Sequence, residues 1–151
     1  MSARRPLRVL IVEDEAPLAM QLEAFLTDAG HEVVGWATSS SEAMEMYQRT
    51  RPDLAFIDLH LADGNTGLDV AREIRASDHS MVVFITANVS MVPEDFAGAI
   101  GVIGKPYSLQ GIGSALKYLH EGIVAPPPEG VLPRSLTLAP DYRERWSHPR
   151  Q

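Results

Sequence analysis

The chain has 151 residues, of which 45% are hydrophobic and 22% are charged, as is ordinary for about one globular domain. It contains no cysteine, which excludes disulfides and thiol catalysis, and no apolar run approaches the roughly 18 residues of a membrane span. Residues 1–122 carry nine Lys and Arg against seventeen Asp and Glu, which argues against binding to nucleic acid. We expect a cytoplasmic protein whose partner is a protein or a small ligand.

Five short apolar runs indicate strands, at residues 9–12, 33–37, 54–57, 82–85 and 101–104. The runs are continuous and rich in Val and Ile, which is typical of parallel strands covered by helices on both faces. Helical patterns follow the first, second, third and fifth runs. The fourth connection has Pro93 in its middle and is too short for a long helix, so a short or irregular turn is expected. The sequence predicts an α/β fold, a doubly wound five-stranded parallel sheet with strand order 2-1-3-4-5.

Polar residues mark where three of these helices begin. Ser39 with Glu42 predicts a capping box, and Thr66 with Asp69 predicts a second one. Ser108 precedes the last helical pattern, in which two glycines weaken helix formation.

The character of the chain changes at about residue 123. Residues 123–151 hold six of the eleven prolines and show no amphipathic helix. This composition predicts an extended tail without a separate effector domain, next to a folded domain at residues 1–122. The segment "SLTLA" (135–139) and Trp146 are apolar enough to dock on the folded domain or on a second copy, which leaves a homodimer open.

Polar side chains follow four of the predicted strands. Glu13 and Asp14 follow the first strand, Asp58 the third, Thr86 the fourth and Lys105 the fifth. The carboxyl ends of the first and third strands meet where the strand order reverses, so the three carboxylates are expected in one pocket. Hard Mg²⁺ would offset their repulsion, while the lysine and threonine could contact a phosphoryl group. The pattern indicates phosphoryl transfer with an aspartate as nucleophile.

The motifs "LIVEDE", "FIDLHLADG", "FITAN" and "GKPY" occur at these strand ends. Over about residues 6–122 the sequence resembles the receiver domain of the two-component response regulator family, which has a flavodoxin-like (βα)₅ fold. The resemblance implies a stand-alone response regulator rather than an enzyme. It also implies a sensor histidine kinase or a histidine phosphotransfer protein as donor, and a downstream protein as the output partner.

The resemblance also implies roles for individual residues. Asp58 would accept the phosphoryl group, and Thr86 and Lys105 would contact it, with a cis bond between Lys105 and Pro106. The Mg²⁺ ligands would be the carboxylates of Glu13, Asp14 and Asp58 and the backbone carbonyl of His60, whose ring would be incidental.

Several features depart from the family pattern, and two of them keep an alternative open. Val102 lies three residues before Lys105, where the family usually has Tyr or Phe, and the stretch from Thr86 to Lys105 is about three residues short. These departures would suit an interaction module that works without phosphorylation. A haloacid dehalogenase-type phosphatase is disfavoured, because His60 stands where that family has a second acid.

Overall fold

A computed structural model describes residues 4–77 and 79–147, so the outer ends of the predicted domain and tail lie outside the described residues. None of its helices is long and apolar enough to cross a lipid bilayer in this described part. The elements in chain order are β1 (Arg8–Val12), α1 (Ala16–Asp28), β2 (Glu32–Ala37), α2 (Ser40–Thr50), β3 (Leu54–Ile57), α3 (Gly67–Ala76), β4 (Met81–Thr86), the 3₁₀ turns η1 (Val89–Met91) and η2 (Phe96–Gly98), β5 (Gly101–Gly104), α4 (Leu109–Val124), β6 (Leu136–Leu138) and α5 (Pro140–Arg145).

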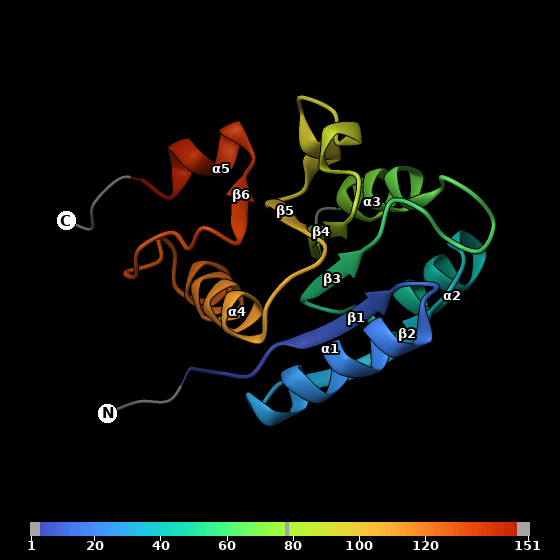
Figure 1. Ribbon diagram of the computed structural model, residues 1–151, viewed down its shortest axis with the longest axis horizontal. Helices are drawn as coiled ribbons and strands as arrows, with labels where there is room; N and C mark the ends of the chain where they lie inside the picture. The colour runs from blue at the N-terminus through green and yellow to red at the C-terminus, as the bar shows by residue number, and fades with distance from the viewer. Residues whose placement is uncertain (1–3, 78, 148–151) are drawn as a thin grey trace.

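The sheet is buried between two helical layers (Figure 1). Successive residues of a strand face opposite sides, so Val9 and Ile11 pack with α1 and α4 while Leu10 and Val12 pack with α2 and α3. This arrangement explains why the strands read as continuous apolar runs: each residue faces a helix on one side or the other.

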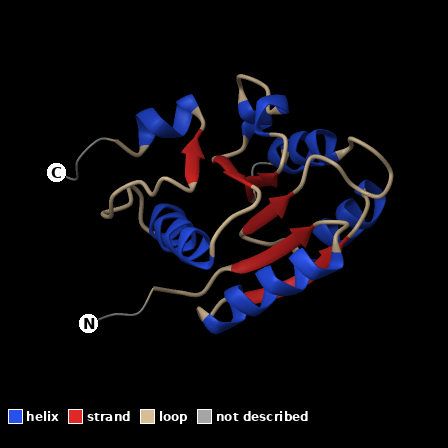
Figure 2. Cartoon of the chain, in the orientation of Figure 1, coloured by secondary structure: helices blue, strands red, loops and turns tan. Residues whose placement is uncertain are grey.

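The strands lie in the order β2-β1-β3-β4-β5-β6. The first five pair in parallel, which confirms the predicted fold class and the order 2-1-3-4-5. The sequence did not predict β6, which pairs antiparallel with β5 and places Thr137 opposite Val102. Figure 2 shows β6 at the edge of the sheet, between α4 and α5.

The predicted helix starts are confirmed at Ser39 and Ser108, whose side chains accept hydrogen bonds from the backbone N–H groups of Glu42 and Gly111. The reciprocal half of the first capping box is absent, because the Glu42 carboxylate accepts from the N–H and the hydroxyl of Thr38 instead.

The second predicted capping box, at Thr66 and Asp69, is wrong. Thr66 has helical backbone angles and makes no side-chain cap. Its hydroxyl donates to Asp63 Oδ1 at 2.7 Å, and Asp63 also accepts from the backbone N–H of Ser40. A nearby carboxylate therefore takes the hydroxyl that the local pattern had assigned to the helix end.

The connection between β4 and β5 is irregular, as predicted, and consists of η1 and η2. Phe96 and Ala97 have φ of 53° and 51°, a backbone region that non-glycine residues adopt only when their surroundings hold them there. Arg72 of α3 contributes to this restraint through two hydrogen bonds to the Asp95 carboxylate.

The tail is not simply extended, because it forms β6 and the short helix α5. Leu138, Tyr142 and Trp146 are buried in the same apolar cluster as α1 and α4, so the tail docks on the domain of its own chain. Two glycines make room for it. A Cβ on Gly101 would lie 2.3 Å from the Thr137 carbonyl oxygen, and one on Gly122 would lie 2.4 Å from the Trp146 indole.

His31 fixes the turn between α1 and β2. Its Nδ1 accepts a hydrogen bond from the backbone N–H of Leu7 at 2.9 Å, and its ring packs edge-on against His120 with centroids 4.6 Å apart. Burial lowers the pKa of His31 below its usual 6.5, and the charge of His120 lowers it further. The folded state therefore favours a neutral ring.

We predict that Gly122→Ala lowers the free energy of unfolding by about 1–3 kcal/mol, because the methyl group displaces the Trp146 indole. In a Trp146→Ala background the same change should stabilise by about 1 kcal/mol, since alanine is the better helix former. Urea unfolding of the four proteins measures both values. An equal effect in the two backgrounds would contradict the contact.

We predict that His31 makes stability dependent on pH. The unfolded chain binds the proton at a higher pH than the folded chain, so the free energy of unfolding should fall as the pH drops below about 6.5. His31→Asn keeps an acceptor for the Leu7 N–H but does not titrate, and should flatten this part of the curve. Urea unfolding between pH 7 and 5 measures it, with the exposed His79→Asn as control. Identical curves for His31→Asn and the wild type would refute the prediction.

Candidate functional site

The polar residues expected at one edge of the sheet lie together there. The Asp58 N–H donates to the carbonyl of Val12 at 2.9 Å, and the Lys105 N–H donates to the carbonyl of Thr86 at the same distance. These bonds continue the parallel ladder past the strand ends. They set the side chains that follow β1, β3, β4 and β5 beside one another.

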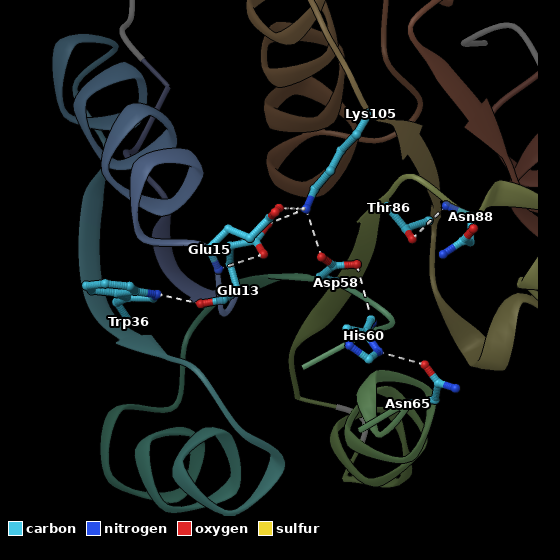
Figure 3. A network of polar contacts seen from close by, with 9 residues as sticks. All are labelled: Glu13, Glu15, Trp36, Asp58, His60, Asn65, Thr86, Asn88 and Lys105. Atoms are coloured by element: carbon cyan, nitrogen blue, oxygen red, sulfur yellow. Dashed lines mark hydrogen bonds and ion pairs between the residues drawn. The ribbon is translucent and has the colours of Figure 1, made fainter. Parts of the chain in front are cut away.

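Lys105 lies between the carboxylates of this edge (Figure 3). Its Nζ is 2.6 Å from Glu13 Oε1, 2.7 Å from Asp58 Oδ2 and 3.3 Å from Glu15 Oε2. Burial alone would lower the pKa of Lys105, but the hydrogen bonds and charges of Asp58 and Glu13 outweigh it and raise that pKa. The lysine thus stays charged and neutralises part of the acidic cluster.

Glu13, Asp14 and Asp58 each offer a carboxylate oxygen, and these oxygens lie within 4.8 Å of one another. Burial raises the pKa of Glu13 to about 7, against the opposing pull of Lys105. A divalent cation would supply the positive charge that this cluster still lacks, and carboxylate oxygens are the ligands that Mg²⁺ prefers. The donor set therefore fits Mg²⁺.

A pocket of about 230 Å³ opens onto this cluster, and its walls include Asp14, Asp58, Thr86 and Lys105. Thr86 is buried, and its Oγ1 accepts from the backbone N–H of Asn88 at 3.0 Å. The hydroxyl proton of Thr86 therefore stays available for a group that enters the pocket.

His60 also lines the pocket, and its ring lies 2.9 Å from Asn65 Oδ1 rather than among the acidic oxygens. Its backbone N–H lies 3.4 Å from Asp58 Oδ1. The ring is thus held by Asn65, apart from the three clustered carboxylates.

The bond between Lys105 and Pro106 is cis, as the resemblance implied. Val102 is buried in β5 and packs with the α2 and α3 layer. The position where the family usually has Tyr or Phe is therefore filled by a small, buried aliphatic side chain.

Two contacts of the site were not predicted. Glu15 adds a third carboxylate beside Lys105, and the indole of Trp36 donates to the carbonyl of Glu13. Glu15 stands in the motif "LIVEDE", so its sequence position was a usable signal. The Trp36 contact joins β2 to the residue that follows β1, and a tryptophan in an apolar run does not by itself predict such a contact.

The chain belongs to the response regulator receiver domain family, whose model matches residues 9–117. Chemotaxis protein CheY of Thermotoga maritima is 36% identical over 113 residues, which cover 72% of this chain and 93% of that protein. The fold described above is therefore that of a receiver domain.

A second group of relatives is named PhyR. The phyllosphere-induced regulator PhyR of Methylorubrum extorquens is 39% identical over 88 residues, which are 58% of this chain but only 33% of that protein. The solution structure of the PhyR receiver domain of Erythrobacter litoralis superposes with a TM-score of 0.69 at 28% identity, covering 83% of this chain and 97% of that one. The similarity thus concerns the receiver part of PhyR.

We predict that Lys105→Met lowers the free energy of unfolding at pH 7 by about 3 kcal/mol, because the buried carboxyl groups of Glu13 and Asp58 would lose their hydrogen-bonded cationic partner. The exposed Lys117→Met, which replaces the other lysine of the chain, is the matched control and should change little. Urea denaturation in metal-free buffer measures both. A Lys105→Met protein as stable as the control would show that the ion pairs contribute nothing net.

Proposed function

We propose that this receiver domain is a response regulator of a two-component system or phosphorelay in the cytoplasm, and that Asp58 accepts a phosphoryl group with Mg²⁺ bound. The observation that carries the proposal is the contact of Lys105 Nζ with Asp58 Oδ2 at 2.7 Å, in a pocket that also holds Asp14 and Thr86. The Asp58 carboxylate, the Lys105 ammonium and the Thr86 hydroxyl all border this pocket. These are the groups that phosphoryl transfer needs.

In the proposed reaction an Asp58 carboxylate oxygen attacks the phosphorus of a phosphohistidine on the donor protein. A phosphorus–oxygen bond forms, and the phosphorus–nitrogen bond breaks with its electron pair leaving on the imidazole, which solvent protonates. Lys105 would then exchange a carboxylate partner for a phosphoryl oxygen, and Thr86 would donate its hydroxyl proton to another. Mg²⁺, when bound, would stabilise charge on the phosphoryl oxygens.

The Mg²⁺ would be held by the carboxylates of Glu13, Asp14 and Asp58, with the backbone carbonyl of His60 as a further ligand. The three carboxylate oxygens that lie within 4.8 Å of one another support this assignment. Asp14 supports it further, because it lines the pocket and makes no ion pair with Lys105 among the described residues.

The proposed donor is a sensor histidine kinase or a histidine phosphotransfer protein, and the output is binding to a downstream protein or onward transfer. Phosphorylation would add about −1.5 to −2 charges at the pocket. Residues 1–122 form the receiver in this proposal and residues 123–151 the tail, whose strand β6 pairs with the β5 edge. The β5 edge is therefore not open to a partner or a second copy while the tail is docked.

A second candidate is an interaction module that binds its partner without phosphorylation. Val102 favours it, because a buried valine in β5 leaves no aromatic ring to move toward Thr86. The two candidates differ in one property, the effect of Asp58→Asn on partner binding. The module would tolerate that change, whereas a phosphorylated switch would not.

We predict that the protein gains one phosphoryl group on incubation with Mg²⁺ and acetyl phosphate, and that Asp58→Asn gains none because its amide replaces the nucleophilic carboxylate. Intact mass spectrometry measures the gain, and an EDTA-treated sample tests the need for the metal. Size-exclusion chromatography of the same samples shows whether phosphorylation changes the oligomeric state.

Labelling of Asp58→Asn would place the nucleophile at another residue. No labelling of the folded wild type, by acetyl phosphate or by a phosphorylated histidine donor, would favour the interaction module.

A further inference from the structure

Trp36 lies beside the site without reaching into its pocket. It is the next-to-last residue of β2. Its exposed fraction is 38%, which is high for a tryptophan because this side chain is usually largely buried. Its Nε1 donates to the carbonyl oxygen of Glu13 at 2.7 Å (Figure 3). The indole therefore has a polar contact at the site in addition to its packing.

The bonded carbonyl belongs to the peptide group that joins Glu13 to Asp14. The Glu13 N–H donates to the carbonyl of Ala37 at 2.9 Å, which is the last ladder contact from β1 to β2. Because β2 ends at Ala37, the Glu13 carbonyl takes its donor from the Trp36 side chain. The indole thus adds one hydrogen bond between β2 and the chain that leaves β1, at the peptide group that joins Glu13 to Asp14.

The two acids of this pair are held differently. The Glu13 carboxylate contacts Lys105 and the backbone N–H of Glu15. Within residues 4–77 and 79–147, no hydrogen bond or ion pair holds the carboxylate of Asp14. The direction of the Asp14 side chain therefore depends on its backbone. The peptide group that precedes Asp14 is held by the hydrogen bond from Trp36.

We propose that Trp36 is a positioning residue for the acidic pair, and that its indole N–H sets the peptide plane which presents Asp14 to a divalent cation. This inference rests on the proposed function, in which Glu13, Asp14 and Asp58 hold Mg²⁺. Trp36 would not touch the ion. Removing its donor should weaken cation binding while the fold and the apolar packing persist.

The test uses the full chain with Mn²⁺ as the probe, its binding followed by electron paramagnetic resonance and confirmed by competition with Mg²⁺. Trp36→Phe keeps an aromatic ring without the donor and should bind Mn²⁺ about tenfold more weakly. Trp36→His places Nε2 where the indole nitrogen lies and should restore affinity to near the wild-type value. Trp146→Phe, which replaces the other tryptophan in α5's C-terminal cap, should bind as the wild type does.

Each other outcome has a distinct meaning. Wild-type affinity in Trp36→Phe would overturn the inference, and so would equal weakening in Trp36→Phe and Trp36→His, because the ring rather than its donor would then matter. Melting temperatures without metal separate positioning from a general loss of stability. A wild type that binds no cation would instead refute the Mg²⁺ part of the proposed function.

Discussion

The ion pairs of Lys105 with Glu13 and Asp58 are the interaction on which this edge of the sheet depends. Carboxylates that follow neighbouring parallel strands are forced together and partly desolvated, and each would be costly without a counter-charge. The lysine follows β5, so a single ammonium joins the ends of β1, β3 and β5. The same arrangement suits the proposed reaction, because the Lys105 ammonium that offsets the buried acids also lies beside the Asp58 oxygen that would carry a phosphoryl group.

The second constraint is the edge of β5. The connection from β4 to β5 has only short 3₁₀ turns, and the tail strand β6 pairs with the β5 edge. Unpaired strand edges expose backbone groups that invite association with other chains, and β6 satisfies those of β5. Gly101 and Gly122 leave the space that Thr137 and Trp146 occupy, so the tail is part of the folded domain.

These two constraints bear on how a signal would leave the site. Val102 lies in β5 between the tail and the α2 and α3 layer, and a valine cannot make the large rotation of an aromatic ring. The strained segment at Phe96 and Ala97, held by Arg72 through Asp95, lies between Thr86 and β5. A change that started at Thr86 would therefore meet an irregular segment and a docked tail in place of the usual aromatic residue.

The sequence by itself determined the five parallel strands, their order, the irregular fourth connection and the polar residues at the strand ends, because each is visible in local patterns of apolar and polar residues. It also determined the family, through motifs at those ends. Tertiary structure decided the rest. Three features depend on which groups folding brings close together: the hydrogen bond from Thr66 to Asp63, the pairing of β6 with β5 and the contact of Trp36 with Glu13. The conformational preferences of neighbouring residues do not predict such contacts. The proline-rich tail reads as extended for the same reason: its strand and helix are stabilised by long-range burial against α4 and β5.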